Sequence, residues 1–392
     1  MFSQTDIDRF RKETKGTNQV IHLNNAGSAL PPDCVREGVL QFVEEEMTQG
    51  GYEIHEKYFT ELEGTYDSIA RLINAESEEV ALQENATVAW GAAFQAIEFQ
   101  DGDEILTCQW DYSSNYLSYL HLKRKTAIVV KIIPNDASGQ VDVDSIEALI
   151  TDKTKLISIV HVPTNGGIVN PVAAIGTVAK KHGILYQVDA CQSAGQVPID
   201  VRAIGCDILS ATGRKYLRGP RGTGFLFVRK AILGQLIPTS VDLHAANWTA
   251  TNTYVIREDA RRFENWESNY SGIYGLKKAV DYILDIGMES IWQRIQELGA
   301  YLRDKLQALD KVTVYDLGKV KGGIVTFSIA GHTAAAVKEH LKQHNINISW
   351  VATPNARLDM ESRKIPEMCR SSVHYYNTED EVDQFIEVLG ML

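Results

Sequence analysis

Two short segments of the chain place a chemically active side chain directly after an apolar run. Lys215 lies in the turn Thr212-Gly-Arg-Lys215, and Arg214 is its neighbour. A nearby cation lowers the pKa of a lysine and favours the neutral amine that forms a Schiff base. Asp189 directly follows the apolar run 184–188. A carboxylate at that place is costly to bury without a cationic partner, and a pyridinium nitrogen is one such partner.

Two polar segments could complete such a site. In Gln83-Glu-Asn-Ala-Thr-Val88, Asn85 or Thr87 caps a predicted helix, and the free N–H groups at the start of a helix bind phosphate. His161-Val-Pro-Thr-Asn165 is a polar loop behind another apolar run. Taken singly, all four segments have plainer explanations: a solvated basic turn, two helix caps and an ordinary turn. Taken together, they provide an anion site, a carboxylate and a lysine, which are the groups that pyridoxal 5′-phosphate (PLP) requires.

These groups meet only if their segments end at one edge of a sheet, and the chain between residues 80 and 228 predicts such a sheet. Short β-rich runs alternate there with helical stretches, which indicates right-handed βαβ crossovers and a mostly parallel sheet covered on both faces. Ligands of such sheets bind beyond the carboxyl ends of the strands. The predicted strands are 105–108, 127–133, 155–160, 184–188, 207–211 and 224–228, separated by predicted helices at 86–97, 113–123, 143–150 and 172–181.

The pattern changes in the C-terminal third of the chain, which predicts a second domain. We expect a large cofactor-binding domain at 18–270 and a smaller α+β domain at 271–392, with 1–17 packed on the smaller one. The smaller domain is predicted to contain helices 273–286, 289–309, 333–343 and 378–389 and strands 323–329, 346–349 and 370–374. The fold class is therefore α/β with an additional small α+β domain.

Composition narrows the class of protein further. The 392 residues carry a formal net charge of −12, and such an acidic surface repels nucleic acid. No apolar run is long enough for a membrane helix, and the charged start of the chain lacks a secretory signal. The five cysteines are scattered without a CxxC pair, which is typical of reduced thiols rather than a metal site. We therefore expect a cytoplasmic enzyme that acts on a small-molecule substrate and has no metal site.

With these motifs in place, the chain resembles the class V aminotransferases, the group that contains cysteine desulfurases, selenocysteine lyases and cystine C–S lyases. The resemblance runs from Leu23-Asn-Asn-Ala-Gly27 to the segment 370–378, and the VDxxQ and [ST]GxK motifs are specific as a pair. It implies PLP fold type I, the cofactor PLP, an amino-acid substrate and a homodimer with active sites near the subunit interface.

The resemblance also implies roles for individual residues. Lys215 would form the Schiff base, Asp189 would pair with the pyridinium nitrogen, and Tyr112 would stack on the cofactor where the family has a histidine. Arg370 would bind the substrate carboxylate, with Asn25 beside the same pocket. The remaining expected contacts are Gln192 and Asn165 to the phenolic oxygen O3′, and Ala86, Thr87, Thr212 and Arg214 to the phosphate.

Two departures from the family pattern bear on the chemistry. Trp266-Glu-Ser-Asn269 stands where family dimers often contribute a phosphate contact to the partner subunit. Desulfurases also carry a nucleophilic cysteine on the loop before the carboxylate arginine, whereas residues 351–368 contain none. Cys369 is expected to be a packing residue. Without a mobile thiolate, attack on the substrate sulfur has no nucleophile.

We therefore expect β-elimination from an S-substituted cysteine or cysteine sulfoxide, with release of pyruvate and ammonia. The segments 213–224, 263–267 and 374–379 are similar to the C–S lyases that act on hercynylcysteine sulfoxide in ergothioneine biosynthesis. An aminotransferase or an isopenicillin N epimerase-like enzyme is the alternative, and a non-catalytic cofactor-binding protein is a third. The joint presence of Lys215, Asp189 and Arg370 argues against the third.

Overall fold

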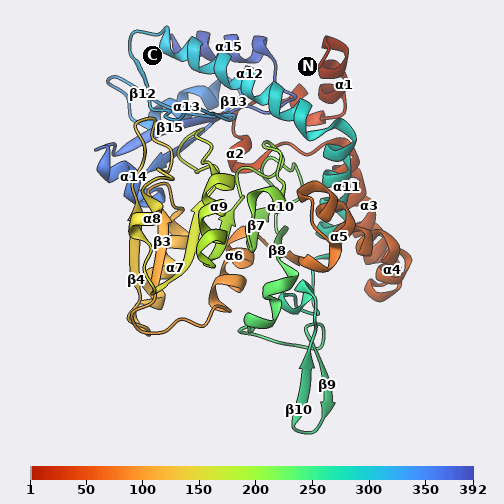
Figure 1. Cartoon of the computed structure of the whole chain (residues 1–392). Coiled ribbons are helices and arrows are strands. Elements are labelled where there is room, and N and C mark those ends of the chain that lie inside the picture. Colours follow the sequence, from red (N-terminus) through yellow and green to blue (C-terminus); the bar gives the residue numbers. More distant parts are fainter. Residues whose placement is uncertain (1) are drawn as a thin grey trace.

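A seven-stranded mixed sheet forms the centre of the larger part of the computed structural model, which describes residues 2–392 (Figure 1). Five neighbouring strands are parallel, and the last two pair antiparallel at one edge, so the predicted mostly parallel sheet is confirmed. In spatial order the strands are β2 (Val80–Gln83), β8 (Gly224–Val228), β7 (Ile208–Thr212), β6 (Leu185–Asp189), β5 (Thr154–Val160), β3 (Glu104–Cys108) and β4 (Val129–Ile133).

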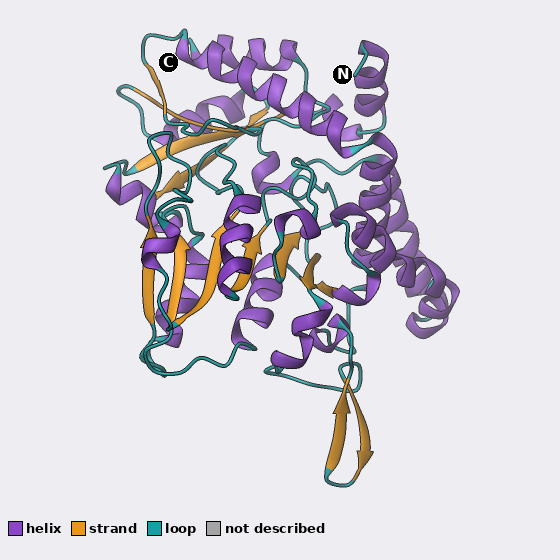
Figure 2. Ribbon diagram, in the orientation of Figure 1, coloured by secondary structure: helices purple, strands orange, loops and turns teal. Residues whose placement is uncertain are grey.

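Helices cover this sheet on both faces (Figure 2), which explains why residues on both faces of its central strands are buried. All residues of β7 and β8 are buried. The crossover helices are α6 (Ala86–Gln95), α7 (Ser113–Leu122), α8 (Ile146–Leu149), α9 (Val172–His182) and α10 (Val201–Ile204). Beside them pack α3 (Asp33–Gln49), α4 (Gly51–Lys57), α5 (Phe59–Ile73) and the long α11 (Tyr270–Ile286).

The C-terminal third contains a second, four-stranded antiparallel sheet with its own apolar core. Its strands, in spatial order, are β11 (Val312–Val314), β12 (Ile324–Ile329), β15 (Glu367–Ser372) and β14 (Ser349–Ala352). The helices α12 (Met288–Gln307), α13 (Ala334–Gln343) and α15 (Glu379–Leu389) pack against this sheet. The boundary between the two predicted domains, at residues 270 and 271, stays a prediction.

Two predicted strands of this region were wrong in their limits. Strand 370–374 begins earlier, at Glu367, because Cys369 pairs with both Phe327 of β12 and Trp350 of β14. The predicted strand 346–349 is two strands, because the chain changes partners within it. Its first part, β13 (Ile346–Asn347), pairs with β1 (Ile21–His22), and β14 begins at Ser349.

Two further elements were missed by the periodicity of the sequence. The segment 351–368, expected as a loop, contains the helix α14 (Arg357–Ser362), and Val351, Met360 and Met368 bury their side chains in one small cluster. A hairpin of β9 (Ala246–Ala250) and β10 (Thr253–Ile256) projects away from the body of the molecule (Figure 1).

The N-terminal segment packs against the C-terminal third. Helix α1 (Gln4–Lys12) begins with a capping box between Ser3 and Asp6. The ring of Phe10 lies 5.2 Å from that of Tyr375, and Arg11 forms a 2.7 Å ion pair with Glu381 of α15. No helix within residues 2–392 is both long and apolar enough to cross a membrane.

Candidate active site

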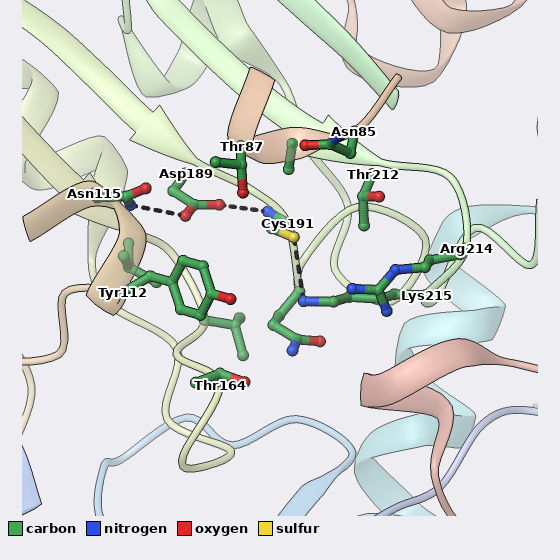
Figure 3. Close-up of a pocket in the computed structure, with 14 residues that line it drawn as sticks. Asn85, Thr87, Tyr112, Asn115, Thr164, Asp189, Cys191, Thr212, Arg214 and Lys215 are labelled. Atoms are coloured by element: carbon green, nitrogen blue, oxygen red, sulfur yellow. Dashed lines mark hydrogen bonds between the residues drawn. The ribbon is translucent and has the colours of Figure 1, made fainter. Parts of the chain in front are cut away.

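A cavity of about 220 Å³ lies beyond the carboxyl ends of β6 and β7, where the motifs predicted it (Figure 3). Strands β5, β6 and β7, the start of α6 and the start of α7 all contribute to its wall. Its lining side chains are Asn85, Ala86, Thr87, Tyr112, Asn115, Val160, Val162, Thr164, Asp189, Cys191, Gln192, Thr212, Arg214 and Lys215. Eight of the eleven predicted site residues therefore line one cavity, and Asn25, Asn165 and Arg370 do not.

Lys215 is a buried amine at the side of this cavity. Its Nζ lies 3.2 Å from the Sγ of Cys191, which is its one hydrogen-bond partner within the described residues. Burial lowers the pKa of Lys215, and the positive charges of Arg214 and Arg370 lower the pKa further. A lysine with a lowered pKa is available as the neutral amine, so it can act as a nucleophile or a base.

The turn that carries Lys215 is held by Arg218, which the sequence motifs did not single out. Arg218 has a left-handed backbone, with φ of 61°, and its guanidinium is buried. It donates hydrogen bonds to Oγ1 of Thr14 at 2.6 Å and to the carbonyl of Leu30 at 2.8 Å, and it lies 4.4 Å above the ring of Tyr376. These contacts fix the turn three residues after the lysine.

Asp189 ends β6 and points into the cavity from its buried side (Figure 3). Its Oδ1 accepts a hydrogen bond from the N–H of Cys191 at 2.8 Å, and its Oδ2 accepts one from Nδ2 of Asn115 at 3.0 Å. Burial raises the pKa of Asp189, while the two hydrogen bonds and Lys215 act in the opposite direction. No cationic side chain among residues 2–392 forms an ion pair with this carboxylate. Asp189 can therefore form an ion pair with a cation that binds in the cavity.

The opposite end of the cavity has the features of an anion site. Oδ1 of Asn85 accepts a hydrogen bond from the N–H of Val88 at 3.0 Å and caps α6, so Ala86 and Thr87 present the start of that helix to the cavity. Thr212 and Arg214 lie nearby (Figure 3). Gly224 allows β8 to pack closely against β7, because a Cβ at this position would lie 2.6 Å from the carbonyl oxygen of Ala211. A helix start beside a guanidinium favours phosphate.

Gln192 and Asn165 were both expected beside O3′, but the structure separates them. Gln192 lines the cavity, its Nε2 donates to the carbonyl of Ala26 at 3.1 Å, and its buried Oε1 has no partner among residues 2–392. Asn165 lies behind the lining, where its Nδ2 donates to Oδ2 of Asp359 on α14 at 2.7 Å. The nitrogen of the Asn165 amide is therefore engaged by the segment 351–368, while its buried Oδ1 has no partner among the described residues.

Arg370 and Asn25 also lie outside the lining, in different states. Nη1 of Arg370 donates to the carbonyl and hydroxyl oxygens of Thr164, at 3.0 and 2.7 Å, and its buried Nε has no partner in the described part of the chain. Burial lowers the pKa of Arg370 to about 10. Asn25 is fully buried, and its amide bonds to the carbonyl of Ser372 at 2.7 Å and to the hydroxyl of Tyr376 at 2.5 Å. These contacts tie Asn25 to the segment 372–376, and its expected place beside the substrate stays a prediction.

The cavity contains three polar side chains that the motifs did not identify as functional. Asn115 lies on α7, three residues after Tyr112, and Thr164 directly precedes Asn165. Cys191 lies within the VDxxQ motif, between Asp189 and Gln192. Spacing relative to recognised motif residues is the one sequence signal that could have found them.

Comparisons with known proteins agree with this geometry. A model of the family described as Aminotransferase class-V matches residues 21–385. A probable cysteine desulfurase of Methanothermobacter thermautotrophicus is 27% identical over 94% of each chain. The apo structure of a cysteine desulfurase from Thermococcus onnurineus NA1 superposes with a TM-score of 0.89 at 27% identity, covering 100% of this chain and 98% of that one. The cystine C–S lyase C-DES shares the fold, with a TM-score of 0.87 at 21% identity over 96% of this chain and 99% of that one.

The side chains of the cavity fit PLP, the cofactor of this family. The buried Asp189 carboxylate has no cationic partner among residues 2–392, and the ring nitrogen of PLP supplies one. The unpartnered Oε1 of Gln192 shows that this amide has hydrogen-bonding capacity left inside the cavity. The capped start of α6 and Arg214 suit the phosphate, and Lys215 lies between these two ends. The expected fold and cofactor are thus confirmed.

Proposed function

The chain belongs to the class V aminotransferase family and is a PLP-dependent enzyme, and from this premise we propose that it acts as a carbon–sulfur lyase. The reaction is β-elimination: the Cβ–S bond of an S-substituted cysteine breaks, the sulfur leaves as a thiol, and water converts the remainder to pyruvate and ammonia. A cysteine sulfoxide would release a sulfenic acid instead. Within this class, the similarity of segments 213–224, 263–267 and 374–379 favours a hercynylcysteine sulfoxide-like substrate.

The observation that carries the proposal is the absence of a usable thiol beside the substrate arginine. No cysteine occurs at 351–368, and that segment contains the helix α14. Cys369 is 1% exposed in the core of the small sheet, and burial raises the pKa of Cys369 to about 12. A buried neutral thiol outside the cavity cannot attack a sulfur atom inside it. Cys191 does line the cavity, but burial also raises the pKa of this thiol, and Cys191 lies on the loop after β6 rather than on the segment before Arg370. The similarity to cysteine desulfurases supports cleavage of a C–S bond. Because β-elimination needs no nucleophile from the protein, it is compatible with the missing thiolate.

Lys215 is the proposed base. A neutral amine at Nζ can take the proton from Cα of the substrate and return it to the product, and a positioned base of this kind contributes roughly 10²–10⁴-fold. When bound, PLP supplies an electron-withdrawing ring that stabilises the negative charge developing at Cα. Asp189 holds the proton on the ring nitrogen, and the N–H of Cys191 and the amide of Asn115 keep this carboxylate oriented.

Substrate orientation is assigned to Arg370, which lies outside the lining of the cavity and contacts Thr164 of the lining. Arg370 would exchange its hydrogen bonds to Thr164 for the two oxygens of the substrate carboxylate, as a bidentate pair. Tyr112 is 37% exposed at the start of α7 and would cover one face of the ring. Ala86, Thr87, Thr212 and Arg214 would hold the phosphate.

Product analysis tests this function. The purified holoenzyme is incubated with cystine, cysteine and an S-alkylcysteine sulfoxide, and pyruvate, ammonia and the sulfur product are measured without an added keto acid. Stoichiometric pyruvate and ammonia support the lyase. Turnover that requires a keto acid identifies an aminotransferase, and exchange of the Cα proton in D₂O without pyruvate identifies an epimerase; either result contradicts elimination.

We also propose that the protein acts as a homodimer. The β9–β10 hairpin exposes Trp248 at 74%, with Tyr254 and Val255 beside it, and Leu243 is exposed in the preceding segment. An apolar patch of this kind favours burial against another protein surface. Light scattering should give the dimer mass for the wild type and a monomer for Trp248→Glu. Trp350→Glu, an exposed tryptophan of β14, is the control that should remain dimeric, and a monomeric wild type would contradict the proposal.

A further inference from the structure

Behind Asp189 lies a second buried carboxylate, which the proposed reaction does not use. Nδ2 of Asn115 donates to Oδ2 of Asp189 at 3.0 Å and to Oδ1 of Asp111 at 3.2 Å. An amide nitrogen carries two hydrogens, so one Nδ2 can serve both carboxyl groups. All three side chains are at most 5% exposed. The network joins the loop after β3, the first turn of α7 and the end of β6.

Asp111 is itself held in place by two further hydrogen bonds. The Oγ1 of Thr107 lies 2.6 Å from its Oδ2, and the N–H of Tyr112 donates to its Oδ1 at 2.8 Å. This leaves the carboxyl group no freedom to turn away from Asn115. A side chain that is fixed on both oxygens can fix its neighbour in turn.

We propose that Asp111 is a positioning residue that acts through Asn115 to orient the amide toward Asp189 and so keeps the Asp189 carboxylate ionised against the cofactor. An asparagine amide has two ends of similar shape, and a rotated Asn115 would present an oxygen to Asp189 in place of a donor. With Asp111 present, the rotated amide would place that oxygen against two carboxyl groups. The inference rests on the proposed pairing of Asp189 with the ring nitrogen.

The charge of the pair agrees with this role. Burial raises the pKa of Asp111 to about 7, and the charge of Asp189 contributes. The other titratable groups that face Asp111 are Cys108, Tyr116 and Tyr119, and burial raises the pKa of each, so they stay neutral near pH 7. The proton on Asp111 can lie on Oδ2 toward Thr107, which leaves Oδ1 to accept from Asn115. One negative charge then remains, on Asp189, to match one ring cation.

This arrangement predicts which substitutions are tolerated. Asp111→Asn keeps a donor toward Thr107 and an acceptor toward Asn115, so it should preserve the network. Asp111→Ala frees the amide to rotate, and Asn115→Asp removes the donor and adds a repelling carboxyl group. Ser118→Ala is the matched control, because this α7 hydroxyl donates only to the carbonyl of Ser114. Asp189→Asn is the reference for complete loss of the charge.

Two measurements test the proposal: the Kd for PLP, from titration of the apoenzymes, and the pH at which the absorption band of bound PLP changes. We expect Asp111→Ala and Asn115→Asp to weaken PLP binding about tenfold or more and to shift the spectral pH profile in the direction of Asp189→Asn. Asp111→Asn and Ser118→Ala should stay within about threefold of the wild type. Melting of each apoenzyme verifies folding, and if Asp111→Ala does not fold, Asn115→Asp and Asp111→Asn decide.

Distinct results would overturn distinct claims. Wild-type Kd and pH profile in Asp111→Ala or Asn115→Asp, together with a clear effect of Asp189→Asn, would refute the positioning role alone. An Asp111→Asn variant as impaired as the alanine variant would also refute it. A wild-type Kd and spectrum in Asp189→Asn would show instead that the pairing of Asp189 with the ring nitrogen is wrong.

Discussion

The site has a cofactor end around Asp189 and a substrate end around Arg370. The two ends differ in how many hydrogen bonds their buried polar groups make within the protein. At the cofactor end, both oxygens of Asp189 accept hydrogen bonds, and the donors Asn115 and Cys191 are held by neighbouring elements. At the substrate end, Arg370 donates to Thr164, its buried Nε has no partner within residues 2–392, and Nδ2 of Asn165 donates to Asp359. The carboxylate of the cofactor end has its hydrogen bonds in place and lacks only a counter-charge among residues 2–392, whereas the contacts of the substrate end must be exchanged when a substrate carboxylate binds.

The origin of the elements explains this difference. Asp189 and Lys215 follow neighbouring strands of one sheet, so the backbone ladder fixes their separation. Arg370 and Asp359 come from β15 and α14 of the C-terminal third, and each reaches the loop after β5 through its own side chain. Binding the substrate carboxylate must therefore exchange contacts that already exist. Substitutions at the two ends should consequently affect different quantities.

The largest effect is expected where the two ends meet, at Lys215. Lys215→Ala should lose covalent attachment of PLP and at least the roughly 10²–10⁴-fold that a positioned base contributes to kcat. The test is borohydride reduction of the PLP-loaded variant followed by mass spectrometry of its peptides. Pyridoxyl found on another lysine would show that the base lies elsewhere.

At the cofactor end, Asp189→Asn should retain PLP with weakened affinity and lose about 10²–10³-fold in kcat, with little change in KM. An amide cannot balance the ring cation, so the charge that develops during reaction is less stabilised. Steady-state kinetics with a cysteine S-conjugate measures this split. A near-normal kcat in Asp189→Asn would contradict the claim that substitutions at the two ends affect different quantities.

At the substrate end, Arg370→Ala should lower kcat/KM and leave the PLP content unchanged. The decrease should correspond to a loss of about 2–5 kcal/mol in transition-state stabilisation. Arg370→Lys keeps the charge but loses the two-pronged geometry and should fall between the alanine variant and the wild type. The measurement combines kcat/KM with the absorption spectrum of each variant. Loss of PLP in both variants would indicate that Arg370 supports the cofactor end instead.

A smaller effect concerns the link from Asp359 to Asn165. Burial raises the pKa of Asp359 to about 6, against about 3.9 in an unfolded chain. The stability that this shift provides is complete below about pH 4 and is lost as the pH rises to about 6. Asp359→Asn does not titrate, so its melting temperature should rise relative to the wild type across that window. If the difference in melting temperature between Asp359→Asn and the wild type did not change with pH, the raised pKa of Asp359 would be wrong.

The smallest effect is expected for Cys369, which lies near Arg370 in sequence but outside the cavity. Cys369→Ala should cost about 1 kcal/mol of unfolding free energy from lost packing and leave C–S cleavage intact. Urea unfolding and mass spectrometry of substrate-treated enzyme measure the two parts. A persulfide on Cys369 that turnover requires would make the protein a desulfurase.

Sequence patterns alone were enough to predict the parallel sheet, the PLP cofactor and the segments whose side chains line the cavity. These features are local, because an apolar run followed by Asp189, or by the turn to Lys215, describes a strand and the residue at its end. The pairing of β15, the helix at 357–362 and the engagement of Asn25 by Ser372 were decided by contacts between distant segments. The contact of Asn115 with both Asp111 and Asp189 arises the same way, because it forms only when α7 packs against the ends of β3 and β6. Periodicity reports which face of an element is apolar, but only the packed chain decides which polar group each buried side chain meets.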